Sequence, residues 1–474
     1  MRAVSPAVRL MLVGAAALLG AAAQPADDLA GRWYGTVRIE EGMRLRLIVD
    51  LRRTPGGWTG SLDAPDQGTF GLRLAAVEVA PPLVRFAVVG PAGSPAFEGV
   101  PDDAGERLVG TYRQGPEEHP CVFERAPSPP LRPQDPQPPL PYHSEDVTFA
   151  SAASDREVLA GTVTAPRGPG PHPGVVLVGG SFAQDRDGTV VAHRPLRLLA
   201  DRLTRSGFAV LRWDDRGVGG SGGVANRATS QVQAADVVGA VRWLRRDPRI
   251  GDQPIGALGH SEGVTVAARA AAAERLAFLV ALAGPALPGE PLVLRQLQLT
   301  GDAEGLPDAL IARQLELRRR MIEALRGGDP RVRRAAVREI VRLQLGLEGA
   351  ARGDRFEAAV EATVDAVDNP WFRDFLEHDP RVDLAGLGIP VLWLCGAHDL
   401  QVDPRQNLPH VVAALRRAGS PDATVHVLPG LNHLLQNAVT GSPLEYGMIE
   451  ETMAPAALEA IEQWLTRRFV RPGQ

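Results

Sequence analysis

The sequence predicts an α/β protein: a mostly parallel sheet with helices on both faces, preceded by a small all-β domain. After residue 143, apolar runs such as 174–180, 208–215 and 255–260 alternate with helical segments. This alternation is typical of parallel strands that are buried on both faces. Residues 25–126 instead hold short strand-like runs between Gly, Pro and Asp turns, without a helical pattern.

The small domain is expected to be a five- or six-stranded meander or small barrel. Its strand-like runs are TVRIE, LRLIVDLRR, LRLAAVEV, LVRFAVV and LVGTYRQ. The segment GRWYGTV resembles the first strand of lipocalin-like barrels, in which a Trp closes one end; the simpler interpretation of Trp33 is a core residue. Residues 127–142 are rich in proline, so we expect a stiff, extended linker there.

Residues 143–474 are expected to form the larger α/β domain. Apolar runs at 276–284, 389–396 and 423–430 continue the sheet, and a helix near PAALEAIEQWLTRR is the last element. More than a hundred residues separate neighbouring sheet strands between Gly284 and Ile389, and this stretch is strongly helical. We therefore predict a helical cap, inserted at about 286–385 over the carboxyl edge of the sheet.

The N-terminus resembles a secretory signal peptide. MRAVSPAVRLMLVGAAALLGAAAQ has two early arginines, an apolar run too short for a comfortable membrane span, and small residues before Gln24. We therefore expect residues 1–23 to be removed during export to the periplasm or the cell exterior. No stable membrane insertion is expected after this cleavage; an uncleaved single-span anchor is the alternative.

Composition excludes several classes of function. The net charge is −5, which argues against a nucleic-acid-binding surface. The chain contains no lysine, so a Schiff-base lysine and a lysine-bearing phosphate loop are excluded. The two cysteines, Cys121 and Cys395, fall in different predicted domains and cannot form a zinc site alone. We expect both thiols to stay free, and we expect neither a metal nor a cofactor.

The stretch PIGALGHSEGVTV, residues 254–266, predicts the reactive centre. Ser261 follows a predicted strand and precedes a predicted helix, which is the context that the nucleophile motif G-x-S-x-G requires. The turn is so sharp that larger side chains at Gly259 or Gly263 would collide with the strand and the helix. A second match to the pattern surrounds Ser221 in GGSGG, but no helix follows immediately, so we expect a flexible loop there.

A serine nucleophile needs a base and an acid. His433, in LPGLNHLL just past the last strand, can reach over the sheet edge, and the order serine, acid, histidine places the base last. The loop LCGAHDLQVDP offers Asp399 and Asp403 as the acid. We favour Asp399 at the mouth of the strand, since Asp403 precedes Pro404 and fits better as a helix cap.

The negative charge that forms on the substrate oxygen needs two N–H donors. The backbone N–H of Glu262 is one, and Ser181 in GGSFAQDRDG is our choice for the other, with Gly180 next. His260 and Glu262 flank the serine, but neighbours of a nucleophile on a tight turn project away from it. We therefore expect His260 to pack or hydrogen-bond beneath the turn.

The chain from about residue 143 resembles bacterial serine esterases of the α/β-hydrolase superfamily, in the exported group that carries a small N-terminal β domain and a helical insertion. The matching stretches are GGSFAQDRDG, LRWDDRGVGGS, GHSEG, NPWFRDFL, CGAHDLQVDP and LPGLNHLLQNAVTGSPLEYGMIEE. The resemblance implies the α/β-hydrolase fold and hydrolysis of carboxylic esters, with Ser261 as nucleophile, Asp399 as acid and His433 as base. Phe182 and Val264 stand where such proteins usually or often have glycine, and Phe182 is expected to narrow the acyl pocket.

The predicted activity is the hydrolysis of a small-molecule ester, with a short to medium acyl chain, through an acyl-enzyme. Three alternatives remain. A peptidase of the same superfamily usually carries a β-propeller, for which residues 25–126 are too few. A CoA thioesterase would meet its substrate in the cytoplasm, whereas this chain is expected to be exported. A non-catalytic binder would use the β domain, but an intact triad with both oxyanion loops argues against it.

Overall fold

The computed structural model describes residues 29–470, with the exception of 41–42, 65–68, 81–82, 90–93, 103, 116, 126–131, 345–352 and 448. The predicted signal segment and the first residues of the predicted linker lie outside the described residues. The chain divides into two compact units between Pro129 and Pro130. No helix of the described part is long and apolar enough to cross a bilayer. Signal cleavage, export and the predicted domain boundaries stay predictions.

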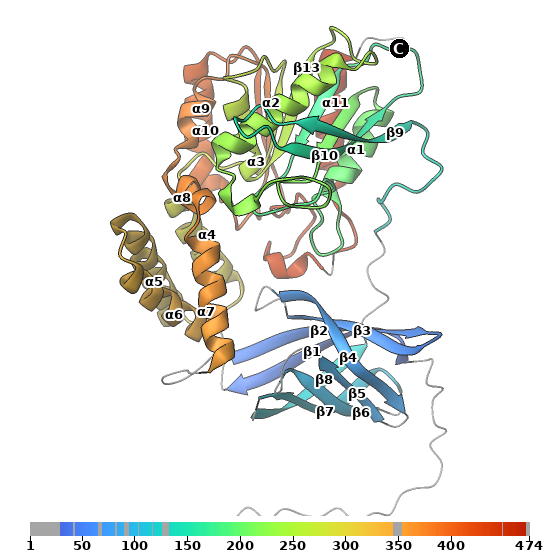
Figure 1. Ribbon diagram of the computed structural model, residues 1–474, viewed down its shortest axis with the longest axis vertical. Coiled ribbons are helices and arrows are strands. Elements are labelled where there is room, and N and C mark those ends of the chain that lie inside the picture. Colours follow the sequence, from blue (N-terminus) through green and yellow to red (C-terminus); the bar gives the residue numbers. More distant parts are fainter. Residues whose placement is uncertain are drawn as a thin grey trace, which may run out of the picture. The chain divides into compact units, whose positions relative to one another are not determined.

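The first unit is a closed antiparallel barrel, in which each strand pairs with the next and the last pairs with the first (Figure 1). Its strands are β1 (Gly31–Glu40), β2 (Met43–Thr54), β3 (Gly57–Ala64), β4 (Thr69–Ala80), β5 (Leu83–Val88), β6 (Ala96–Pro101), β7 (Arg107–Gln114) and β8 (Glu117–Arg125). The expected number of five or six strands is wrong. The sequence reading missed β3, β6 and β8, because glycine, proline or charged residues interrupt their apolar alternation.

The interior of the barrel is filled with side chains. Phe86, Phe97 and Phe123 pack against one another, with ring centroids between 4.9 and 5.9 Å apart. Trp33 is fully buried beside them, and its indole N–H donates to the carbonyl of Leu29 at 3.2 Å. Trp33 is thus a core residue, as its simpler interpretation predicts. Cys121 belongs to the same core, where burial raises the pKa of its free thiol to about 12.

The second unit is built on an eight-stranded mixed sheet with the order β16-β15-β14-β13-β11-β12-β10-β9 (Figure 1). Its strands are β9 (His143–Ala150), β10 (Val158–Ala165), β11 (Gly174–Val178), β12 (Ala209–Trp213), β13 (Ile255–His260), β14 (Leu279–Leu282), β15 (Val391–Gly396) and β16 (Ala423–Leu428). Strands β11 to β16 are parallel, whereas β9 and β10 are antiparallel additions at one edge. The predicted strands all lie in the parallel part.

Helices cover both faces of this sheet. On one face lie α2 (Ser230–Arg246), α3 (Glu262–Ala270) and α10 (Pro404–Ala418), and on the other lie α1 (Pro195–Arg205) and α11 (Pro455–Phe469). Successive residues of one strand enter opposite cores: Val176 packs with α2 and α3, whereas Leu177 packs with α1 and α11. This two-sided burial explains why the strands read as continuous apolar runs. The predicted fold class is confirmed.

A helical insertion separates β14 from β15. It consists of α4 (Gly289–Ala303), α5 (Asp308–Gly327), α6 (Pro330–Gln344), α7 (Asp354–Val367) and α8 (Pro370–Glu377), followed by the short α9 (Pro380–Leu384). The insertion has an apolar core of its own, which includes Leu317, Val337, Val360 and Trp371. Leu384 of α9 packs instead into a core of the sheet. Figure 1 shows α4 to α7 gathered as a bundle. We call helices α4 to α8 the cap.

Candidate active site

Ser261 stands on a strained turn between β13 and α3. Its φ is +54° and its ψ is −125°, in a region that residues with a side chain rarely adopt. The Ser261 N–H donates to the carbonyl of Leu282 on β14 at 2.8 Å, and the Ser261 carbonyl accepts from the N–H of Val264 at 3.0 Å. These bonds hold the strained residue at the carboxyl end of β13, where the sequence places the nucleophile.

Glycine is required on both sides of this turn. A Cβ at Gly259 would lie 2.4 Å from the carbonyl oxygen of Gly263, and a Cβ at Gly263 would lie 2.2 Å from that of Gly179. Both distances are far inside van der Waals contact, so the predicted collisions are real. A Cβ at Gly284 would lie 2.7 Å from the Val264 side chain. Gly284 therefore leaves space for the side chain of Val264, which stands where similar esterases often have glycine.

His433 and Asp399 form a hydrogen-bonded pair beyond the ends of β16 and β15. The Nδ1 atom of His433 lies 2.8 Å from Oδ2 of Asp399, and both side chains are buried. Oδ1 of Asp399 accepts the backbone N–H groups of Gln401 at 2.9 Å and Val402 at 2.8 Å. Because the carboxylate can only accept when ionised, it selects the imidazole tautomer with a proton on Nδ1. The lone pair of Nε2 is then free to take a proton.

The two predicted partners of Ser261 thus lie together at the sheet edge that carries the serine. The side chain of His260 connects them to the turn: its Nε2 donates to the carbonyl of His433 at 3.0 Å, and the two imidazole rings lie 4.8 Å apart. Within the described residues, the hydroxyl of Ser261 makes no hydrogen bond. In structures without substrate, catalytic hydrogen bonds are often long and tighten only when the substrate binds.

The residues predicted to supply the oxyanion donors lie in two segments near the serine. Glu262 is the first residue of α3, and its N–H has no partner in the described part of the chain. Such free N–H groups at a helix start favour negative charge. The loop after β11 approaches from the other side: a Cβ at Gly180 would lie 3.2 Å from Cβ of Ser261. Ser181 is the next residue, and its role as an oxyanion donor stays a prediction.

The side chain of Glu262 has a role that the sequence reading did not foresee. It is buried, and its Oε1 accepts the indole N–H of Trp371 from the cap at 3.0 Å. Burial raises the pKa of Glu262, while hydrogen bonds from the Ser181 hydroxyl and Trp371 act in the opposite direction. Trp371 also packs on Phe182, with ring centroids 5.2 Å apart. The Glu262 carboxyl thus links the turn at Ser261, the loop that carries Ser181 and the cap.

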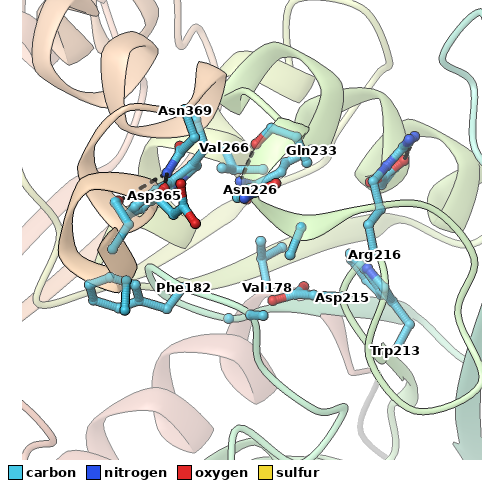
Figure 2. Close-up of a pocket in the computed structure, with 18 residues that line it drawn as sticks. Val178, Phe182, Trp213, Asp215, Arg216, Asn226, Gln233, Val266, Asp365 and Asn369 are labelled. Carbon is cyan, nitrogen blue, oxygen red and sulfur yellow. Dashed lines mark hydrogen bonds and ion pairs between the residues drawn. The ribbon is translucent and has the colours of Figure 1, made fainter. Parts of the chain in front are cut away.

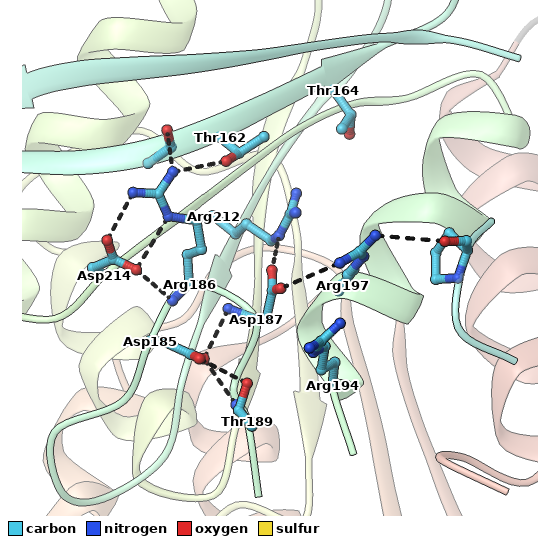
Figure 3. Close-up of polar contacts among 12 residues, drawn as sticks. Thr162, Thr164, Asp185, Arg186, Asp187, Thr189, Arg194, Arg197, Arg212 and Asp214 are labelled. Carbon is cyan, nitrogen blue, oxygen red and sulfur yellow. Dashed lines mark hydrogen bonds and ion pairs between the residues drawn. The ribbon is translucent and has the colours of Figure 1, made fainter. Parts of the chain in front are cut away.

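Ion pairs anchor the loop that carries Ser181 (Figure 3). Arg186 pairs with Asp214 at the end of β12 at 2.7 Å and donates to Thr162 on β10 at 2.9 Å. Asp187 pairs with Arg212 on β12 at 2.9 Å. Arg212 and Asp214 are buried, so solvent screens these pairs less than it would at the surface. The anchors therefore fix the conformation of the loop that carries Ser181.

A cleft of about 310 Å³ opens beside this loop (Figure 2). Val178 and Gly179 line it at the end of β11, and Phe182 forms part of its wall with 74% of its surface exposed. The cap contributes Ala362, Asp365, Ala366, Asn369 and Trp371, and the remaining lining residues are Ala183, Trp213, Asp215, Arg216, Ala225, Asn226, Ala228, Gln233, Asp236 and Val266. Phe182 therefore borders a pocket, but it does not fill it.

Two residues that the sequence set aside have structural roles. The Ser221 hydroxyl donates to the carbonyl of Asp214 at 2.6 Å and accepts the N–H of Ala160 at 2.9 Å. Asp403 caps α10 by accepting the N–H of Arg405 at 3.0 Å, as predicted. In the described residues, no group of three or more His, Cys, Asp or Glu side chains is placed to hold a metal ion. The absence of a metal or cofactor stays a prediction.

A serine on a strained strand-to-helix turn, a histidine–carboxylate pair beyond later strands and a capped, mostly parallel sheet together define an α/β-hydrolase. The family model described as serine aminopeptidase, S33, matches residues 193–438, which is more than half of the 474-residue chain. The chain belongs to this family and is a hydrolase. The matched range contains Ser261, Asp399 and His433.

Similar proteins include esterases and a peptidase. Esterase EstD of Thermotoga maritima is 24% identical over 332 residues, which cover 69% of this chain and 70% of the relative. The esterase Pf2001 of Pyrococcus furiosus has a TM-score of 0.42 at 15% identity, over 70% of this chain and 92% of its own. The proline iminopeptidase of Mycobacterium smegmatis has a TM-score of 0.40 at 19% identity, over 68% of this chain and 98% of its own.

Proposed function

We propose that this chain is a serine esterase that hydrolyses small-molecule carboxylic esters with short to medium acyl chains. The observation that carries the proposal is the 2.8 Å contact between His433 Nδ1 and Asp399 Oδ2, at the same sheet edge as the strained Ser261. The similarity to esterase EstD supports an ester as the substrate. No metal or cofactor is required by this chemistry.

In the proposed mechanism, His433 takes the proton of Ser261 through Nε2 while Oγ attacks the ester carbonyl. Asp399 fixes the tautomer of the imidazole and stabilises its charged form. The backbone N–H groups of Glu262 and Ser181 stabilise the oxyanion, and each such donor contributes about 3–4 kcal/mol to the transition state. His433 then returns the proton to the leaving alcohol, and water hydrolyses the acyl-enzyme by the same steps.

The proposal predicts that Ser261→Ala lowers kcat for a p-nitrophenyl ester by about a millionfold, because the covalent step is lost while binding remains. Ser221→Ala is the matched control, since this serine lies in the second G-x-S-x-G match; it should retain most of the activity. A fluorophosphonate probe should label the wild type and Ser221→Ala but not Ser261→Ala. Substantial esterase activity in Ser261→Ala would contradict the proposal.

Peptide-bond hydrolysis is the second candidate, because the matched family is described as a serine aminopeptidase. The same Ser261 would attack an amide, whose nitrogen must be protonated before it leaves. Matched p-nitrophenyl esters and p-nitroanilides of one acyl group separate the candidates. The esterase is favoured if the ratio of kcat/KM for the ester to kcat/KM for the anilide is well above the ratio of their uncatalysed hydrolysis rates. This comparison corrects for the greater intrinsic reactivity of the ester.

A further inference from the structure

The cleft of about 310 Å³ lies next to the nucleophile turn, because Gly179 lines it and packs against Gly263 of the turn. Gly179 and Phe182 lie on either side of the oxyanion residues, and Val266 belongs to the helix that begins directly after Ser261. Trp371, from the cap, lines the cleft and donates to the Glu262 side chain. The cleft is therefore close enough to Ser261 to be considered for one arm of a substrate whose carbonyl lies at this serine.

The sheet order determines which arm of an ester faces the cleft. Asp399 and His433 follow β15 and β16, on one side of β13, whereas the cleft is lined from the ends of β11 and β12, on its other side. His433 must stand next to the leaving alcohol, because it returns a proton to it. The alcohol arm therefore faces β15 and β16, and the acyl arm faces the cleft.

The hydrogen-bonding groups that remain available in the cleft are mostly acceptors. The guanidinium of Arg216 is already occupied by Asp236 and by Asp155, at 2.7 Å and 2.5 Å. The amide nitrogen of Gln233 donates to the carbonyl of Ala228 at 2.9 Å, which leaves its oxygen Oε1 as an acceptor. The indole of Trp371 is used by Glu262. Among the side chains that line the cleft, the remaining donors include the amide of Asn226, the indole N–H of Trp213 and the second N–H of the Gln233 amide.

Two carboxyl groups in the cleft have no cationic partner among the described residues. Asp215 accepts one hydrogen bond, from the N–H of Gln184 to Oδ2 at 2.9 Å, and Figure 2 shows its carboxyl directed towards the middle of the cleft. Asp365 reaches the cleft from α7. Burial, and then the charges of Asp236 and Glu262, raise the pKa of Asp215 to about 7. A hydrogen-bond donor on a ligand would stabilise these carboxyl groups, since it would supply the partner that they lack.

We propose that this cleft binds the acyl arm of the substrate and selects an arm that carries a hydrogen-bond donor, either a hydroxyl or an ammonium group, for Asp215, Gln233 and Asp365. Apolar walls from Val178, Val266 and Trp371 accommodate the methylene part of the arm, and the acceptors bind its end. The inference rests on the proposed esterase function and names its substrate class: esters of hydroxy or amino acids with the donor distant from the carbonyl.

The test compares four methyl esters with the full-length protein at pH 8: hexanoate, 6-hydroxyhexanoate, 6-aminohexanoate and the monomethyl ester of adipic acid. The alcohol arm is the same in all four, so differences report on the acyl arm. We expect kcat/KM for at least one donor-bearing ester to exceed that for hexanoate about tenfold, as one added hydrogen bond to a charged acceptor implies. The adipate ester, which ends in a carboxylate, should fall below hexanoate. The hydroxyl and amino arms identify which donor is preferred.

Asp215→Asn should reduce the preference for the donor-bearing esters to near that for hexanoate, mainly through KM. Asp252→Asn is the matched control, because Asp252 is exposed in the turn before β13; it should keep the preference. If Asp215→Asn fails to fold, Asp365→Asn, which alters an exposed residue of the cleft, must lower the preference instead.

The outcomes separate the two proposals. Hydrolysis of hexanoate as fast as, or faster than, both donor-bearing esters overturns the inference but leaves the esterase function intact. A donor preference that Asp215→Asn and Asp365→Asn both retain also overturns it. If no ester is hydrolysed and the fluorophosphonate does not label Ser261, the proposed function itself fails, and the inference fails with it.

Discussion

At Ser261, two histidines lie side by side, and their surroundings separate their roles. Of the two, His433 bonds a carboxylate, whereas His260 donates to the carbonyl of His433. Burial, and then the nearby imidazole of His433, lower the pKa of His260 to about 3. His260 is therefore neutral at physiological pH and is too weak a base to compete for the serine proton. Its hydrogen bond orients the loop that carries His433.

The bond between Trp371 and Glu262 should be important for stability. Trp371→Phe removes the indole N–H and leaves Oε1 of a buried carboxyl without this donor. We expect a loss of about 1–3 kcal/mol in the free energy of unfolding, because an unpaired buried polar group costs its desolvation. Urea unfolding of both proteins measures this difference. Trp243→Phe is the control, since Trp243 is a half-buried residue of α2; an equal loss in both variants would contradict the prediction.

The proposed catalytic residues were identifiable from sequence because each follows a strand in a known order. Ser261, Asp399 and His433 needed only the strand pattern and the rule that reactive groups collect at the carboxyl edge of a parallel sheet. The part played by Trp371 was not predictable. It lies 109 residues from Glu262 in sequence, and nothing local indicates where a cap helix will return to the sheet. The aromatic stretch NPWFRDFL was the one available indication.

Among the elements, the turn from β13 to α3 has little tolerance for larger residues. A Cβ at Gly263 would lie 2.2 Å from the carbonyl oxygen of Gly179, at the start of the loop that carries Ser181. Gly263→Ala must therefore displace that loop or the helix, and we expect at least about 1–3 kcal/mol of destabilisation and a lower kcat. Thermal unfolding and ester kinetics test both effects.

Gly327→Ala provides the control for this substitution. Gly327 ends α5, and a Cβ there would meet nothing within 4 Å. Alanine has the higher helix propensity, so this variant should be as stable as the wild type or slightly more stable. If both alanine variants behave alike, steric contact at Gly263 does not control the turn.

The elements that were predicted well from the sequence are those with one clear hydrophobic pattern. Strand β13 appeared with its observed limits, because an unbroken apolar run ends at a turn motif. The antiparallel β9 and β10 were missed, since their runs HSEDVTFA and VLAGTVTA mix polar and apolar residues. Such strands depend on cross-strand pairing and on a sheet edge, which are tertiary properties that a local window does not contain.

For the whole molecule, the two units have separate apolar cores. One core lies within the barrel, and the others lie within residues 149–470. Units with separate cores can unfold independently. The buried histidines with lowered pKa, His193 and His260, both belong to the larger unit. As the pH is lowered, the larger unit should therefore lose stability before the barrel does.

The direction of this effect follows from His193. Burial lowers the pKa of His193 to about 4, whereas the unfolded chain binds the proton with the ordinary histidine pKa of 6.5. Between these values the unfolded state holds more protons, so the free energy of unfolding falls as the pH is lowered from 6.5 to 4, by about 2–3 kcal/mol for this group. Asp215, with its pKa raised to about 7 from 3.8, acts in the opposite direction, because its folded form binds the proton more tightly.

Two variants separate these contributions. His193→Gln should flatten the acid-induced loss of stability of the larger unit, whereas Asp215→Asn should steepen it, since the opposing group is removed. Urea unfolding at several pH values between 4.5 and 7.5 measures both slopes, and the barrel transition is an internal reference that neither substitution touches. Parallel pH profiles for His193→Gln and the wild type would show that His193 is not buried in its neutral form. A flatter profile for Asp215→Asn would show that Asp215 does not keep its proton in the fold, and the charge assigned to the cleft would then have to be revised.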